Sequence, residues 1–91
     1  MYSFDYSETL KKILNKLFKK DKDLYHRVLK KINEIINSSN IEHYKNLRYD
    51  LKDYKRVHVG QFVLAFKFDK KNNFIHFEDF DHHDNIYKKK F

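Results

Sequence analysis

Imidazole, phenol and guanidinium side chains gather in the second half of the chain, and together they could transfer protons and bind phosphate. Arg56 and His58 are two positions apart, so a β-strand would place both on one face, about 7 Å apart. Further on, residues 82–87 carry two adjacent imidazoles and a phenol. Cleavage of RNA without a metal needs a base for the 2′-OH, positive charge for the phosphorane and an acid for the leaving 5′-oxygen. Histidine, tyrosine, lysine and arginine can divide these tasks.

The same residues have simpler interpretations. Arg56 and His58 could belong to a solvated sheet face, and Tyr87 could be a packing residue of a terminal turn. Residues 88–90 are three lysines, which could form a solvated basic tail that touches phosphates without reading sequence. Spacing alone does not decide between these interpretations and the chemical one.

A metal site is the other chemical possibility. Possible ligands lie close together in the sequence: His76, Glu78, Asp79, Asp81, His82, His83 and Asp84. Strand alternation is expected to send His76 and Glu78 to one face of the sheet. It would send Asp79 and Asp81 to the other. Because the chain also has no HxxxH or HExxH spacing, we expect no metal ligands and no cofactor.

Composition limits the class of protein. The 91 residues suit one compact domain covering 1–91, and nine Phe with seven Tyr supply its core with large apolar area. Without Cys there is no disulfide and no thiolate chemistry. Neither a membrane span nor a secretory signal is visible, so we expect a cytoplasmic protein. The net charge of +7 suits a polyanionic partner such as RNA, DNA or an acidic protein, although codon composition and solubility could also explain it.

The first half of the chain predicts a strand followed by two helices. Residues 2–6 alternate as a short strand, and Ser7 is a plausible N-cap. Residues 10–18 then repeat apolar side chains at helical spacing. Asp21 and Asp23 favour the start of a second helix, because negative charge interacts favourably with the helix dipole there. This helix should end at residues 37–40.

In the second half the apolar period changes from helical to two. After an irregular segment at 41–53, we expect strands at 54–59, 62–68 and 74–80, with Gly60 and Gln61 as the first turn. The turns are too short for parallel crossovers, so these strands should be antiparallel. The predicted class is α+β, in the order β-α-α-β-β-β, with an antiparallel sheet and a two-helix hairpin on one face. A short tail follows at 82–90.

Two segments resemble the RelE branch of the RelE/ParE toxin superfamily. Members typically read Tyr-Arg-(aliphatic)-Arg-Val-Gly-Asp-Tyr-Arg across the second strand and turn, where residues 55–63 read Lys-Arg-Val-His-Val-Gly-Gln-Phe-Val. Many members end with a His/Arg pair shortly before an aliphatic residue and Tyr, as residues 82–87 do. Residues 47–51 resemble the Lys-Leu-x-x-Leu stretch before the second strand. The order of elements matches over essentially the whole chain.

The resemblance implies a RelE-like fold and the toxin half of a type II toxin–antitoxin system. Such a toxin is a hydrolase that cuts messenger RNA in the ribosomal A site and so inhibits translation. It needs no metal or other cofactor. Its protein partner is a cognate antitoxin, often acidic, and the free toxin is expected to be monomeric.

By this resemblance Tyr87 or a histidine is the base, His83 the acid, and Arg56 with Lys55 the phosphate clamp. The residues expected to transfer protons are His58, His82, His83 and Tyr87. Those expected to bind RNA or its phosphates are Arg48, Lys52, Lys55 and Arg56.

The chain departs from the family pattern at two cationic positions. Val63 stands where members have an arginine just after the turn, and His58 stands for an arginine or lysine on the second strand. Histidine transfers protons near neutral pH, where arginine cannot. Two alternatives therefore stay open: a RelE-fold toxin without ribonuclease activity, such as a ParE-like gyrase inhibitor or a decayed toxin, and a non-catalytic nucleic-acid-binding module.

Overall fold

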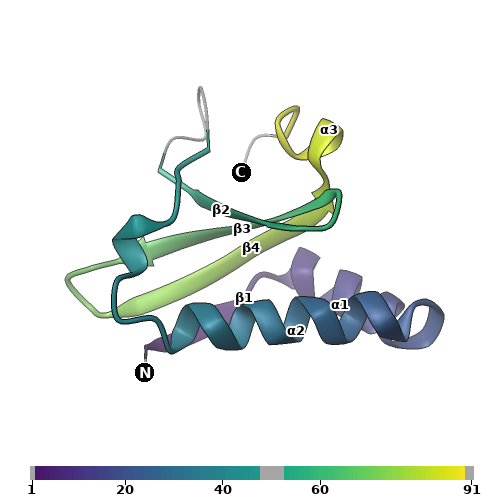
Figure 1. The fold of residues 1–91 in the computed structure, drawn as a ribbon, viewed down its shortest axis with the longest axis horizontal. Helices are drawn as coiled ribbons and strands as arrows, with labels where there is room; N and C mark the ends of the chain where they lie inside the picture. The colour runs from purple at the N-terminus through teal and green to yellow at the C-terminus, as the bar shows by residue number, and fades with distance from the viewer. Residues whose placement is uncertain (1, 48–52, 90–91) are drawn as a thin grey trace.

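A computed structural model describes residues 2–47 and 53–89 and shows a four-stranded sheet between a helix hairpin and a short C-terminal helix (Figure 1). Its elements are β1 (Ser3–Tyr6), α1 (Glu8–Lys20), α2 (Lys22–Ile36), the 3-10 turn η1 (Ile41–His43), β2 (Lys55–Val59), β3 (Phe62–Asp69), β4 (Phe74–His82) and α3 (His83–Ile86). The predicted β-α-α-β-β-β order and α+β class are confirmed. In the described ranges, none of the helices is both long enough and apolar enough to cross a membrane.

The sheet is mixed, whereas the sequence predicted an antiparallel one. Strand order is β1-β4-β3-β2, in which β2, β3 and β4 form the expected antiparallel meander but β1 runs parallel to β4. The cause is the helix hairpin, which returns the chain to the end of the sheet where β1 began (Figure 1). Because β2 then starts in the same direction as β1, a three-stranded meander gives β4 that direction too.

Two polar caps set the helix boundaries as the sequence predicted. The Ser7 hydroxyl accepts a hydrogen bond from the Leu10 amide at the start of α1. Asp21 serves both helices, since its amide donates to the Leu17 carbonyl and its carboxylate accepts from the Leu24 amide. Each bond satisfies a backbone group that a helix end leaves unpaired.

The main core lies between the helix hairpin and one side of the sheet, which we call the helix face. Its buried residues from α1 and α2 include Leu10, Leu14, Val28, Ile32 and Ile35. The strands contribute every second residue, as their alternation predicted: Val59, Leu64, Phe66, Ile75 and Phe77. The opposite side of the sheet, called here the outer face, is where Arg56 and His58 project.

A β-bulge in β4 changes which residues share the outer face. Ala65 pairs with Asp79, but Phe66 pairs with Phe77, so Glu78 is an extra residue at this point. Past the bulge, Asp79 and Asp81 are opposite Ala65 and Val63 on the outer face, the face that also carries His76. The prediction that alternation separates these carboxylates from His76 is therefore wrong, because it assumed an unbroken period of two.

The outer face is partly covered by a second, smaller core. Val63 and Ala65 form its floor, and Leu47 and Ile86 are buried over them, with Tyr54 and Tyr87 half-buried at the margin. Figure 1 shows α3 on the side of the sheet opposite α1 and α2. Residues 82–90 were expected to be a tail, yet part of this segment is a helix that packs on the sheet.

Replacing Ile86 by Ala should lower the free energy of unfolding by about 3 kcal/mol, because it leaves a cavity beneath α3. Ile86 is fully buried. Urea denaturation measures the loss, and hydrogen exchange at the amides of α3 should speed up more than exchange in the main core. An Ile35→Ala variant, which empties the main core instead, is the control. Equal changes in α3 exchange for the two variants would contradict a separate outer core.

Candidate functional site

Arg56 and His58 form a hydrogen-bonded pair on the outer face of β2. Arg56 Nη1 lies 2.8 Å from His58 Nε2. A guanidinium can only donate, so Nε2 is the acceptor and the ring proton resides on Nδ1. In this hydrogen bond the Nε2 lone pair is occupied by the arginine. A phosphate that drew the guanidinium away would release that lone pair for proton transfer.

Arg56 has unused hydrogen-bonding capacity. Its Nε is buried and finds no partner among residues 2–47 and 53–89. A buried donor without a partner costs free energy that an acceptor placed beside it would recover. Because this atom is buried, a ligand oxygen could reach it only if the Arg56 side chain moved.

The strand register defines the floor between the two halves of the site. His58 pairs with Val63, which pairs with Asp81 on the other side. Neighbouring strands are roughly 4.8 Å apart, so β2 and β4 residues of one row are roughly 10 Å apart. Val63 is fully buried on this floor. A cation at this position would have to displace the outer core.

His82 and His83 stand together where β4 leads into α3. Their ring centroids are 4.7 Å apart. His82 Nδ1 accepts from the Asp84 amide at 3.2 Å, and its Nε2 faces Gln61 Oε1 at 3.3 Å. His83 is exposed, and its Nε2 lies 3.0 Å from Asp84 Oδ1. The His83 ring is therefore the more accessible of the two for proton transfer with a ligand.

The His82, His83 and Asp84 side chains could also hold a metal ion. One ligand atom from each lies within 4.8 Å of the others, and this is the one such group found in the described ranges. Two imidazoles and a carboxylate are ligands that Zn²⁺ accepts. A bound ion would occupy both imidazoles, so it would compete with proton transfer by these residues.

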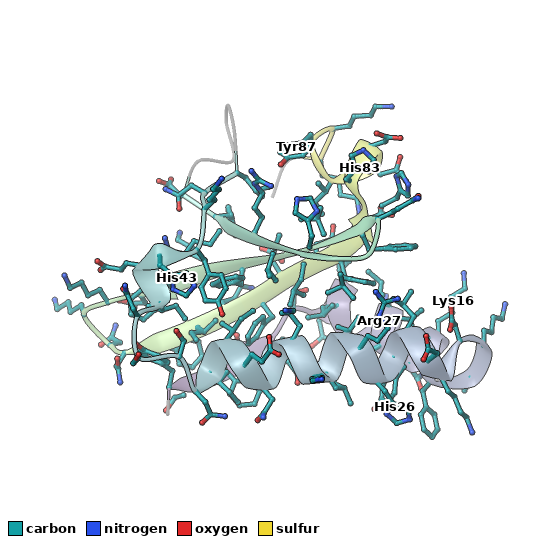
Figure 2. All side chains as sticks on the ribbon, viewed as in Figure 1. Lys16, His26, Arg27, His43, His83 and Tyr87 are labelled. Carbon is teal, nitrogen blue, oxygen red and sulfur yellow. The ribbon has the colours of Figure 1, made fainter. Side chains whose placement is uncertain are left out.

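Tyr87 closes α3 and is half-buried in the outer core beside Ile86. The packing interpretation of this residue therefore describes part of its role. Figure 2 shows Tyr87 and His83 on the same short segment, above the outer face of the sheet. Anchoring by Ile86 thus fixes the phenol and the imidazole relative to one another.

A lysine between two aspartates fastens this C-terminal segment to β4. Lys89 Nζ lies 2.7 Å from Asp79 Oδ2 and 2.7 Å from Asp81 Oδ2. Asp79 is only 3 % exposed, so its charge needs this compensation. Asn85 adds a 3.4 Å hydrogen bond to Asp81. The two aspartates therefore help to determine where α3 and the His82–His83 pair lie.

The same contacts shift the ionisation of these groups. Burial by itself would raise the pKa of Asp81, but hydrogen bonds from Lys89, the His82 amide and Asn85 lower it below its ordinary value. Burial would likewise lower the pKa of Lys89, yet its hydrogen bonds to Asp79 and Asp81 raise it. Both charged forms are therefore favoured in the folded protein.

The remaining predicted phosphate ligands are placed differently. The Lys55 ammonium donates to the Tyr44 carbonyl at 3.1 Å and to Asn46 Oδ1 at 3.2 Å. It thus secures the loop before β2, and the structure does not bring it to the Arg56–His58 pair. Arg48 and Lys52 lie outside the described residues.

Three cations of α2 were missed by the sequence reasoning. Arg27, Lys30 and Lys31 line a hollow of about 280 Å³ together with His58. A signal was present, because these positions follow the i, i+3, i+4 spacing of one helix side, next to the apolar stripe. Alternation in β2 could not show that this helix side reaches His58.

Comparison with known proteins agrees with this architecture. A Methanocaldococcus jannaschii protein named "Putative toxin RelE4" is 53% identical over 91 residues, covering 99% of this chain and 95% of that protein. The chain belongs to the RelE family of toxins. No protein-family model matches the sequence.

Solved structures of two E. coli proteins share the fold. YafQ from E. coli superimposes with a TM-score of 0.74 at 20% identity, covering 96% of this chain and 99% of that one. The intact E. coli RelBE toxin–antitoxin complex gives 0.71 at 18% identity, with 90% and 96% covered. The RelE family thus places a helix hairpin and a β2–β4 meander as this chain does, and the resemblance predicted from its motifs is confirmed.

Replacing Lys89 by Met should lower the free energy of unfolding by about 2 kcal/mol at neutral pH, because Asp79 loses its buried partner. Because folding raises the pKa of Lys89, its ion pairs add stability below the unfolded-state pKa of about 10.4. That stability is lost as pH rises through the folded-state pKa. Because folding lowers the pKa of Asp81, its ionised form adds stability above the unfolded-state pKa of about 3.9. That stability is lost as pH falls through the folded-state pKa.

The stability difference between wild type and Lys89→Met should therefore be largest from about pH 4 to 10 and shrink on either side. Urea titrations across pH measure it. Lys88→Met, at an exposed neighbour, is the matched control and should change little. A difference that stayed constant down to pH 2 would contradict the ion-pair explanation.

Proposed function

We propose that this RelE-family toxin is a metal-independent endoribonuclease that inhibits translation by cutting messenger RNA in the ribosomal A site. The observation that carries the proposal is the Arg56–His58 pair on β2, placed across a small apolar floor from the segment that holds His83 and Tyr87. This arrangement offers a phosphate-binding cation and proton-transfer groups on both sides of one surface.

The chemistry follows from these groups. Arg56 moves from His58 to the scissile phosphate and stabilises charge on the phosphorane. His58 or Tyr87 takes the 2′-OH proton as the 2′-oxygen attacks phosphorus. His83, or His82 beside it, protonates the 5′-oxygen as the P–O5′ bond breaks. The products are a 2′,3′-cyclic phosphate and a 5′-hydroxyl end.

Val63 leaves this site with less positive charge than the family pattern supplies. The remaining cations must therefore hold the phosphate, and histidine takes the place of arginine on β2. A ribosome supplies further groups around a messenger in its A site, which suits a toxin whose own set is incomplete.

A cognate antitoxin is the proposed protein partner. The E. coli toxin of the same fold is held in a complex with its antitoxin. The net charge of +7 favours an acidic partner segment. The free toxin is proposed to be a cytoplasmic monomer of one domain.

Expression of the toxin, with mapping of new 5′-hydroxyl messenger ends, tests the nuclease. Wild type should arrest growth and cut within translated codons. A His58→Ala, His83→Ala, Tyr87→Phe triple variant should lose at least about 100-fold in cleavage rate, since each proton-transfer group contributes about that much or more. His26→Ala is the control, because Figure 2 shows His26 on the side of α2 that points away from the sheet.

Growth arrest without new messenger ends would contradict ribonuclease activity and favour another target, such as gyrase. The absence of arrest would favour a decayed toxin or a binding module. Cleavage that the triple variant retains would show that the site lies elsewhere.

Metal independence has its own test. Cleavage of ribosome-bound messenger should continue unchanged in 1,10-phenanthroline, which removes transition metals but leaves the Mg²⁺ that ribosomes need. The physical reason is that His58, His83 and Tyr87 supply the proton transfers themselves. Loss of activity that added Zn²⁺ restores would assign a catalytic ion to His82, His83 and Asp84 instead.

A further inference from the structure

A basic hollow lies beside the proposed cleavage site, where α2 passes under the β2–β3 hairpin. We propose that it binds a backbone phosphate of single-stranded RNA, next to the phosphate that is cleaved. This inference rests on the proposed ribonuclease function and adds to it the direction in which the RNA leaves the site.

The hollow is formed by one side of α2 and the end of β2. Arg27, Lys30, Lys31 and Glu34 line it from the helix, and His58, Val59 and Gly60 line it from the strand and turn. Its volume of about 280 Å³ is many times that of a water molecule in the liquid, about 30 Å³. A hydrated phosphate group therefore has room to enter.

The charge in the hollow is positive. Lys31 is paired with Glu34 at 2.9 Å, so these two side chains largely offset each other. Within residues 2–47 and 53–89, Arg27 and Lys30 take part in none of the ion pairs. Two exposed cations without acidic partners remain, and a phosphate would satisfy both.

Gly60 holds the Arg27 guanidinium at the wall of the hollow. A Cβ at Gly60 would lie 3.2 Å from Arg27 Nη2, closer than ordinary van der Waals contact, so the guanidinium packs directly on the glycine backbone. Gly60 also has φ +61, which favours glycine at this turn. Figure 2 shows Arg27 on the side of α2 that faces the sheet. The planar fork is thereby positioned to bind a phosphate in bidentate fashion.

The surroundings of Arg27 determine on which side of it the anion binds. Arg27 also lines a second hollow, whose other lining residues include Asp21 and Asp23. Those carboxylates would repel a phosphate. The Lys30 side is therefore the favourable one.

His58 makes the hollow continuous with the cleavage site. This residue lines the hollow from the edge strand β2, and its imidazole is the partner of Arg56. In the other direction across the sheet, Asp79 and Asp81 are paired with Lys89, and the segment that carries Ile86 covers the outer face. An RNA strand with its scissile phosphate at Arg56 should accordingly leave over the edge of β2 towards α2. This continuity favours RNA over an acidic protein segment as the occupant of the hollow, because only RNA would also use the proton-transfer groups.

Binding of a fluorescent, uncleavable 2′-O-methyl RNA oligonucleotide, measured by anisotropy over a range of salt, tests the subsite. For Arg27→Gln/Lys30→Gln, the slope of log K against log salt should fall by ~0.7, the value for one phosphate contact on a single strand. Lys12→Gln/Lys19→Gln removes the same charge from exposed positions of α1 and should leave the slope unchanged. Lys30→Arg, which keeps the charge, should bind as wild type does.

Three results would overturn the subsite. Equal losses in the α1 and α2 double variants would show a general charge effect, and an unchanged α2 variant would show that no phosphate enters. If a polyglutamate peptide bound the wild type but not the Arg27→Gln/Lys30→Gln variant, while RNA bound both, the hollow would be assigned to an acidic protein.

The subsite and the nuclease proposal can fail separately, because this assay involves no cleavage. A selective loss of RNA binding in the α2 variant would support the subsite even if wild type cut no messenger. Cleavage by wild type, combined with unchanged binding by the α2 variant, would retain the nuclease and reject the subsite.

Discussion

The β-bulge at Glu78 is the feature on which the outer face and its candidate site depend. It gives β4 one more residue than β3 and thereby turns Asp79 and Asp81 onto the outer face. There both carboxylates bind Lys89, and the segment carrying His82, His83 and Tyr87 is held against the sheet. Without the extra residue, a buried aspartate would project into the main core among aromatic side chains, at a large desolvation cost.

Much of the fold could be predicted from the sequence, because local signals and global packing agree. The Ser7 and Asp21 caps fix the helix boundaries, and alternation in 54–68 separates the helix face from the outer face. Parallel pairing of β1 with β4 could not be predicted in this way. It depends on the end of the sheet to which the helix hairpin returns the chain. The spacing of apolar residues within one helix or strand carries no information about that position.

Only the parts of the candidate site that depend on spacing within one strand could be predicted from the sequence. Arg56 with His58 followed from a period of two, and the structure brings them together. The bulge broke the same period in β4, so the positions of Asp79 and Asp81 were misassigned. The approach of Arg27 to Gly60 is a contact between elements distant in sequence, which periodicity within one element cannot show.

The pairing of β1 with β4 also affects the order in which the molecule can be assembled. Ser3 pairs with Phe74, and Tyr6 pairs with Phe77, so this part of the sheet joins residues that are far apart along the chain. Closing so long a loop costs chain entropy before the contacts repay it. During synthesis, the first strand must wait until β4 has left the ribosomal exit tunnel. The β1–β4 pairing is therefore a late step, which can form only after the other three strands have been made.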